Sequence, residues 1–529
     1  MTANIERMTW NVLLFLVFVT SCTASGCAKS EKIDLDQCTC DSGTSDTDAD
    51  TDTDGDSDTD GDSDADSDSD TDSDSDTDTE SDSWTGDLDD VCWVTVLGSG
   101  LVGNDGLQID GLSASPSGGV AAYLQDYFNG GFVVMLGTDG APLWVADDGG
   151  EVRQVAALAD GGAIVTSDFE APFSGMEMVM ARLDPEGVPS WSTVIAKDGH
   201  LSGETWEMGL GAEAVFSIGD DGIVVLGAFE DEITLAEGMP EEVVLSSGGD
   251  AVLGTYFAVF DLDGNLVSAV TTTSPLIPRD AAVRQSGGLF AVGEAPFPDL
   301  NSISARTLGS DGAEEWQGLV ASTTGIDPLG VDPRVLAGVE DGMIVATSYD
   351  SFESEMLLWD GAGGSIDITA PPDDDGFSVP SFFVARFTAT GVLDWYAVPG
   401  TTDPSNWAAI AEHGAALDGE GGVVAAGYLS GTVVFGEGEP GETEIAEASD
   451  GYGFVVRYSS DGTLEWARSI PGAGLGQMVV EGVAVLSDGS IAIAGRAEGS
   501  ITFHLQDDVP ITLSPSDGDY VTFVVNLCE

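Results

Sequence analysis

Histidine, the side chain that most often serves as a base or metal ligand at neutral pH, is scarce in this sequence of 529 residues. Only His200, His413 and His504 occur, far apart and without a partner at the spacing of a metal motif. Neither Gly-x-Ser-x-Gly nor His-Glu-x-x-His is present, and carboxylates, 94 in all, are too abundant to single out a pair. Residues 98–103 match Gly-x-Gly-x-x-Gly, but a further loop follows where a dinucleotide site needs a helix. We therefore predict no catalytic residue and no cofactor, and we assign no metal ligand.

Cys22 lies in a setting that indicates covalent modification. The apolar run of residues 12–19 has the length of a signal-peptide core and is too short to span a bilayer as a helix. Val19-Thr20-Ser21-Cys22 follows and resembles a bacterial lipobox, which implies cleavage before Cys22, a diacylglycerol on its thiol and an acyl chain on its freed amine. Cys27 is a second candidate, and an ordinary cleaved signal peptide is the alternative. Thr23 rather than Asp follows Cys22. In Gram-negative lipoproteins, which this motif resembles, the absence of Asp at that position implies transfer to the outer membrane.

A long acidic stretch follows the predicted signal peptide, residues 1–21. We expect residues 22–40 to be an anchor segment and residues 41–90 to be a disordered linker, because Asp alternates there with Ser or Thr and nothing can form a core. Residues 50–55 and 56–61 match the first half of a calcium loop without its later Glu. Weak calcium binding is therefore the alternative to a plain spacer.

The charge balance restricts the class of partner. Asp and Glu number 94 against 14 Lys and Arg, a formal net charge of -80. Such a chain repels phosphate backbones and anionic headgroups, so we predict no nucleic-acid partner. Contact with a membrane is expected only through the lipid anchor.

Two sequence patterns alternate from residue 91 onward. The first is an apolar strand, a Gly-containing turn and a strand that opens with Trp, as in FVVRYSSDGTLEW at residues 454–466. FAVFDLDGNLV is a degenerate copy, in which we place Val267 at the Trp position. The second is an apolar hairpin around an Asp/Gly turn, as in GVAVLSDGSIAIAG at residues 482–495. One copy of each supplies about four strands.

Seven copies of the Asp/Gly pattern indicate an all-β fold, a single β-propeller of seven four-stranded blades over residues 91–529. The first pattern has six intact copies, and its seventh is split between the ends of this domain. FVVNL near the C-terminus supplies one half, and the segment around Trp93 supplies the other. We therefore expect the N- and C-terminal strands to pair and close the ring.

These repeats resemble the seven-bladed β-propeller repeat of bacterial surface and secreted proteins, over most of residues 91–529. The resemblance implies a fold and no activity. Residues 351–380 are the longest departure from the pattern. Thr390-Gly391 to Trp395 is also similar to the Thr-Gly-x-x-x-Trp element of quinoprotein propellers.

The aromatic and basic side chains that recur once per repeat are interpreted as structural. One Trp per blade at one position favours packing between blades over a carbohydrate platform; the set is Trp93, Trp144, Trp191, Trp316, Trp395 and Trp466. The same interpretation applies to the recurring Arg182, Arg306, Arg386 and Arg457.

The split repeat also predicts a disulfide between Cys92 and Cys528. They are the only Cys of the repeat region, and they occupy the two sides of a hairpin whose covalent turn is missing. Neighbouring antiparallel strands bring such positions within bonding distance, and export supplies an oxidising compartment. Cys38 and Cys40 stay unassigned.

The expected function is a non-catalytic binding or scaffold module at the cell envelope, with an unknown protein or polysaccharide partner. The alternative is an envelope enzyme with its site at the propeller channel, either a quinoprotein-like oxidoreductase or a polysaccharide-degrading enzyme. The shortage of Lys and Arg counts against a quinone cofactor. The chain is expected outside the cytoplasm, on the outer membrane, facing either the cell surface or the periplasm.

Replacing Cys22 with Ala should abolish incorporation of labelled palmitate, because the acceptor thiol is lost. Cys27→Ala is the matched control and should leave labelling unchanged. Labelling that survives Cys22→Ala and disappears with Cys27→Ala would move the site, and labelling of the double variant would contradict lipidation.

Overall fold

The computed structural model describes residues 21–23 and most of residues 91–528, all within one compact unit. The segments not described within the latter span are 98–107, 127–129, 148–150, 172–174, 199–211, 218–221, 231, 237–238, 249–252, 273–275, 295–301, 324–332, 339–340, 351–354, 371–378, 402, 404, 447–450, 471–477, 506–509 and 516–519. The predicted linker, the half calcium loops, Cys27 and the Gly-rich motif lie outside the described residues.

Every described element is a β-strand, and the strands form seven four-stranded antiparallel blades. From the innermost strand outward, blade 1 is β3 (Gln108–Ala114), β4 (Val120–Asp126), β5 (Gly130–Leu136) and β6 (Pro142–Asp147); blade 2 is β7 (Glu151–Ala157), β8 (Ala163–Ala171), β9 (Gly175–Leu183) and β10 (Pro189–Asp198); blade 3 is β11 (Ala212–Ser217), β12 (Ile223–Glu230), β15 (Leu253–Phe260) and β16 (Leu266–Thr271).

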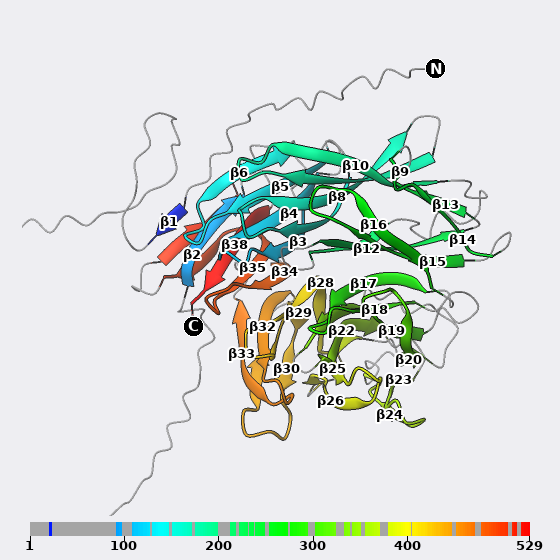
Figure 1. The fold of residues 1–529 in the computed structure, drawn as a ribbon. Helices are drawn as coiled ribbons and strands as arrows, with labels where there is room; N and C mark the ends of the chain where they lie inside the picture. Colours follow the sequence, from blue (N-terminus) through cyan, green and yellow to red (C-terminus); the bar gives the residue numbers. More distant parts are fainter. Residues whose placement is uncertain are drawn as a thin grey trace, which may run out of the picture. The chain divides into compact units, whose positions relative to one another are not determined.

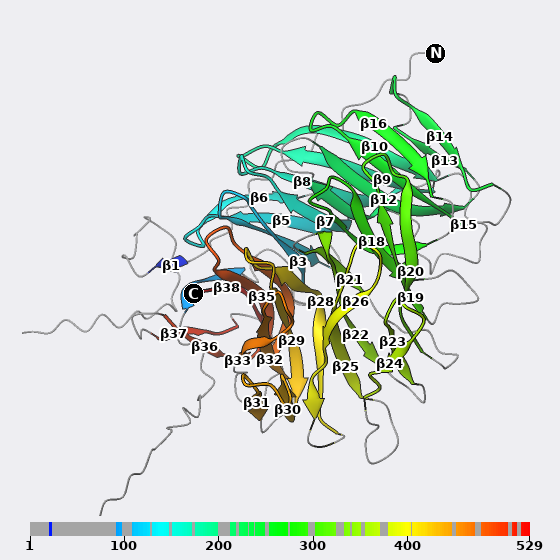
Figure 2. The same cartoon turned by 60° about the horizontal axis from the view of Figure 1, so that its bottom comes forward.

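The remaining blades follow the same order (Figures 1 and 2). Blade 4 is β17 (Ile277–Val283), β18 (Leu289–Glu294), β19 (Ser302–Leu308) and β20 (Glu314–Thr323); blade 5 is β21 (Arg334–Ala337), β22 (Met343–Asp350), β25 (Pro380–Phe387) and β26 (Leu393–Ala397); blade 6 is β28 (Trp407–Leu417), β29 (Val423–Ser430), β32 (Tyr452–Tyr458) and β33 (Leu464–Ile470); blade 7 is β34 (Met478–Val485), β35 (Ile491–Glu498), β38 (Tyr520–Leu527) and β2 (Val91–Leu97).

The ring closes between the two ends of the domain, as the sequence predicted. The innermost strands contact one another in the order β3, β7, β11, β17, β21, β28, β34 and back to β3. In blade 7 the first strand of the domain, β2, pairs antiparallel with the last, β38, and the two lie side by side in Figure 1. Cys92 and Cys528 form the expected disulfide across this pair, with 5.3 Å between their Cα atoms. A covalent bond thus replaces the hairpin turn of the other blades.

The edges of several blades carry further strands. β13 (Glu232–Leu235) and β14 (Val243–Ser246) interrupt blade 3 in sequence but extend blade 2, because β13 pairs with β10 and β14 pairs with β13. β23 (Met356–Trp359) and β24 (Ser365–Asp367), within the long insertion of blade 5, extend blade 4 through β20. Blades 6 and 7 contain similar hairpins, β30 (Thr432–Phe435) with β31 (Thr443–Ala446) and β36 (Ile501–His504) with β37 (Pro510–Leu513). The first of these pairs with β27 (Gly400–Thr401), and β1 (Ser21–Thr23), which contains Cys22, pairs with β2.

The recurring Trp residues join each blade to the next. The turn between the third and fourth strands places a Gly at positive φ, and the ring of the preceding blade's Trp lies against that Gly. The pairs are Trp93 with Gly140, Trp144 with Gly187, Trp191 with Gly264, Trp316 with Gly391 and Trp395 with Gly462. Several indole N–H groups also donate to the same turn, for example Trp395 Nε1 to the Ser460 carbonyl at 3.0 Å. Trp466 packs into the core cluster that contains Val91 and Leu527 of the closing blade.

The Trp position of blade 3 differs from the sequence-based assignment. Ser268, facing Val259, occupies the Trp position of blade 3, and Val267 is exposed beside it. A register shift beside Phe260 lies between the turn and this position. The turn Gly marks it, because each Trp with a covalent turn before it follows the Gly of that turn by four residues, and Ser268 follows Gly264 by four. Arg182, Arg386 and Arg457 face the Trp of their blades, whereas Arg306 faces Gln317, one residue away from the Thr307–Trp316 pair.

Gly462→Ala should destabilise the protein more than Gly287→Ala. The two glycines have nearly the same φ, +87° and +89°. The backbone strain that an alanine introduces, about 1–2 kcal/mol, should therefore be the same at both positions. A methyl group at Gly462 would lie 2.5 Å from Trp395 Cδ2, whereas nothing lies within 4 Å at Gly287. We expect an additional loss of about 1–3 kcal/mol at Gly462, measured by urea unfolding. Equal losses would show that the Trp contact contributes little.

Candidate functional site

The innermost strands surround a cavity of about 940 Å³ along the centre of the propeller. Described residues from the innermost strands of six blades line it, namely β3, β7, β17, β21, β28 and β34. We call the side with the tight turns, such as residues 115–119 and 137–141, the turn face. Pro116, Asp160 and Leu262 belong to such turns and line the cavity, so the cavity extends to that face.

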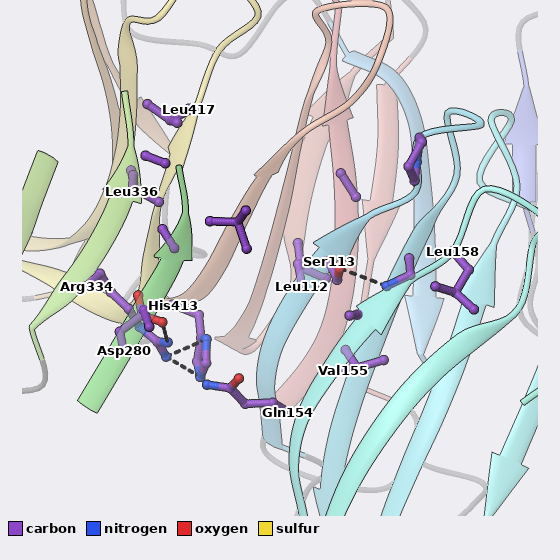
Figure 3. A pocket seen from close by; sticks show the side chains of 18 of the residues that line it. Leu112, Ser113, Gln154, Val155, Leu158, Asp280, Arg334, Leu336, His413 and Leu417 are labelled. Carbon is purple, nitrogen blue, oxygen red and sulfur yellow. Dashed lines mark hydrogen bonds and ion pairs between the residues drawn. The ribbon is translucent and has the colours of Figure 1, made fainter. Parts of the chain in front are cut away.

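The walls of the cavity are aliphatic and mostly small. Alanines recur on the last residues of the innermost strands before the turn, and these short side chains leave the channel wide. Larger apolar side chains lie between them; the set labelled in Figure 3 is Leu112, Val155, Leu158, Leu336 and Leu417. A cavity of this size with apolar walls lies in the range of small-molecule sites.

A polar cluster closes the deep end of the cavity. Figure 3 shows Asp280, Arg334, His413 and Gln154 gathered there, away from Leu336 and Leu417. Arg334 precedes the turn that begins at Gly338 by four residues, which in a strand is about 13 Å. The four side chains come from four blades. We call this group, with Tyr123, the channel floor.

His413 is held between an arginine and a tyrosine. Arg334 Nη2 lies 2.5 Å from His413 Nδ1 and 2.6 Å from Nε2, and the Tyr123 hydroxyl oxygen lies 2.5 Å from Nε2. The Tyr123 and His413 rings meet edge to face, with 5.4 Å between their centroids. Because a guanidinium only donates hydrogen bonds, the imidazole nitrogen that it faces must accept one, which requires a neutral His413.

Burial and charge shift the pKa values of two floor residues away from neutral pH. Burial, and then the positive charge of Arg334, lower the pKa of His413 well below its ordinary value. Burial raises the pKa of the Tyr123 phenol well above its ordinary value, although Arg334 opposes this. His413 and Tyr123 are therefore hydrogen-bonding groups with fixed protonation near neutral pH.

Neighbouring groups hold Arg334 in place. Its Nε donates to the Glu412 carbonyl, and its Nη1 lies 3.6 Å from Asp280 Oδ1. Asp280 Oδ2 accepts the Val335 N–H at 2.9 Å, so this carboxylate joins the innermost strands of blades 4 and 5. Burial raises the pKa of Asp280, with Arg334 acting against that rise.

The floor was not predicted from the sequence, although a local signal exists. Near this depth the innermost strands contain a register shift, and in blades 1, 2, 3, 4 and 7 it skips a single ionisable residue. The skipped residues are Asp110, Arg153, Glu213, Arg279 and Glu481.

Blades 6 and 5 complete this pattern in different ways. His413 lies at the same distance before the turn in blade 6, whereas blade 5 has Pro333 at that position and Arg334 directly after it. An ionisable residue five positions before the turn, or four in blade 5, therefore identifies His413 and Arg334, whereas Gln154 and Asp280 lie one residue closer to their turns than the skipped residue of their blade.

The sequence-predicted site residues are placed as follows. His413 lies in the floor, His504 lies in β36 and His200 is outside the described residues. The recurring arginines are held by neighbouring groups, for example Arg182 by Asp160 at 2.7 Å and Arg457 by Asp418 at 3.0 Å. The described residues contain no cluster of three metal-binding side chains and no helix long and apolar enough to cross a membrane.

No protein-family model matches this sequence, and no curated protein does. Among solved structures, the chain is similar to the WD40 domain of Neurospora crassa Pan2, with 11% identity, a TM-score of 0.38 and coverage of 80% of this chain and 89% of that one. It is also similar to a catalytically inactive virginiamycin B lyase from Staphylococcus aureus solved with quinupristin (11% identity, TM-score 0.37, 82% and 99% coverage) and to a glucose dehydrogenase (11%, 0.30, 72% and 99%). The propeller architecture itself rests on the strand order and pairing described above.

Glu481 should make stability depend on pH. It accepts the Ile109 N–H at 2.9 Å, lies 2.9 Å from Arg496 Nε, and is only 8% exposed. Burial raises its pKa from 4.5 to about 7. The unfolded chain therefore loses this proton first as the pH rises, and the stabilisation present below about pH 4.5 is lost through pH 7.

Relative to Glu481→Gln, the wild-type free energy of unfolding should fall by about 1–3 kcal/mol between pH 4.5 and 8. Urea unfolding across that range measures the difference. Glu444→Gln, at an exposed strand position, is the control and should leave the wild-type profile unchanged. Parallel wild-type and Glu481→Gln profiles would contradict the raised pKa.

Proposed function

We propose that this chain is an outer-membrane lipoprotein that displays its propeller as a non-catalytic binding module, with the central channel as its binding site. The observation that carries the proposal is the channel floor. His413 lies within hydrogen-bond distance of both Arg334 and Tyr123, and the pKa values of His413 and Tyr123 are shifted away from neutral pH. Such a set suits recognition, because a general base needs a free acceptor and a pKa near the working pH.

The lipobox at Cys22 and the acidic linker support the envelope location. A lipid on Cys22 would fix the chain to the membrane, and the long stretch of like charges favours an extended spacer. Because Cys22 pairs with Val94 in the structure, such a spacer would separate membrane and propeller only after β1 leaves β2. The disulfide between Cys92 and Cys528 agrees with an oxidising compartment. The resemblance of the repeats to those of bacterial surface and secreted proteins points the same way.

The quinoprotein alternative lacks a suitable site. A quinone tricarboxylate wants several cations around it, and among the described lining residues only Arg334 and Arg182 are cationic. Both are already held by carboxylates, Arg334 near Asp280 and Arg182 by Asp160. The channel therefore favours binding over this oxidoreductase chemistry.

Surface display is tested with an antibody against the propeller on intact cells. The wild-type protein should be labelled without permeabilisation, and Cys22→Ala should lose the cell-associated signal. A periplasmic protein is the control and should stay unlabelled in the same cells. Labelling of the wild-type protein only after permeabilisation would contradict display.

The absence of catalysis is tested separately. The soluble chain, residues 23–529 exported with a cleavable signal peptide, should release no reducing ends from extracellular polysaccharides. Release that disappears in His413→Gln would instead establish a channel enzyme.

A further inference from the structure

We propose that the channel binds a small uncharged molecule with an elongated apolar body and a carbonyl-type oxygen at its leading end. The oxygen would meet Arg334 at the floor, and the body would lie against the aliphatic walls. This inference rests on the proposed binding function and specifies its ligand class.

The shape of the cavity sets the size and the polarity of the body. Its volume is about 940 Å³, and the floor lies about 13 Å from the turns along the strands. Leu112, Val155 and Leu336 stand on walls otherwise formed largely by alanine. Apolar surface of this kind gains most from a ligand that displaces water along its whole length.

The floor sets the chemistry of the leading end. Arg334 Nη1 carries two N–H groups, and its one contact among the described residues is Asp280 Oδ1 at 3.6 Å, so the second N–H is available to an acceptor in the cavity that Arg334 lines. Gln154, beside His413 in Figure 3, contributes an amide to the same end of the cavity. A carbonyl oxygen is an uncharged hydrogen-bond acceptor and fits the Arg334 N–H.

Charge argues against an ionic ligand of either sign. The chain carries a net charge of -80, which repels anions as they approach. A cation would meet Arg334 at close range in a site of low dielectric constant. An uncharged ligand meets neither penalty.

Binding is tested with two neutral probes that carry a carbonyl group. The first is the fluorophore 6-propionyl-2-dimethylaminonaphthalene, titrated into the soluble chain. We expect saturable binding at one site, with emission shifted to the blue of its value in water. The anionic fluorophore 1-anilinonaphthalene-8-sulfonate should bind at least tenfold more weakly, and equal binding would overturn the assignment of an uncharged ligand.

Narrowing the channel should abolish binding. Ala114→Phe and Ala415→Phe each place a ring on the wall of a different blade, and each should raise the dissociation constant at least tenfold. Ala446→Phe, at an exposed position of β31, is the matched control and should bind as the wild type does. Unchanged affinity in both channel variants would overturn the site.

A mapping experiment with the second probe needs no variant. Benzophenone is neutral and apolar, and on irradiation its carbonyl attaches to nearby C–H bonds. Peptides from the innermost strands, such as those containing Leu112 or Leu417, should carry the label. Labelling confined to the outer strands would overturn the proposal.

Replacing Arg334 alone would leave the buried carboxylate of Asp280 without its partner, so the role of Arg334 is tested in a variant in which Asp280 is neutral. In Asp280→Asn the new amide oxygen still accepts the Val335 N–H, and this single variant serves as the reference. Adding Arg334→Met should weaken binding of the fluorophore about fivefold to tenfold, from the loss of a hydrogen bond. Its bound emission should move further to the blue. The same affinity and emission in both proteins would remove Arg334 from the site. These results concern the channel alone, whereas failure of surface labelling would concern display alone.

Discussion

The indole on the outer strand of one blade rests on a glycine in a turn of the next blade, and this contact sets the spacing between blades. A methyl group on Gly187 or Gly264 would lie 2.9 Å from the nearest carbon of the Trp ring, so the turn must be glycine both for its φ and for the room that it leaves. Because neighbouring blades meet at this distance, their innermost strands stand around a channel rather than a packed centre. The width of the candidate site is therefore decided at the outer part of the blades.

The inner edge of each blade carries unpaired backbone N–H and C=O groups, since no further strand lies beside the innermost one. Ionisable side chains near the register shifts form hydrogen bonds with some of these backbone groups. Glu481 accepts an N–H from blade 1, and Asp280 accepts one from blade 5. These buried carboxylates join neighbouring blades, and burial raises the pKa of each. The layer that forms the channel floor thus also helps to hold the ring together.

The blades could be predicted from the sequence because turn residues lie close together in the chain. The site could not be predicted, because its residues come from distant blades that meet only when the ring closes. Asp-Gly turns and the Trp that follows them are read within about fifteen residues, so the hairpins, the split blade and the Cys92–Cys528 pair were all expected. The Trp position of blade 3 was assigned to Val267, one residue too early, although the distance of four residues from the turn Gly in the other blades gives Ser268. Tyr123, Asp280, Arg334 and His413 are far apart in the chain and meet only because four blades converge. His413, considered alone in the sequence, had no visible partner.

The disulfide has a mechanical consequence when the two ends of the domain are pulled apart. Tension between a residue ahead of Val91 and Glu529 reaches Cys92 and passes through the bond to Cys528, so the chain between the two Cys, which are 436 positions apart, forms a closed loop that lies outside the load path. In an unbonded propeller the edge strand β2 would be peeled from β38 first, and the other blades would follow one by one. Here the loaded path is a few residues long. The blades therefore stay folded while the two ends of the domain carry the load.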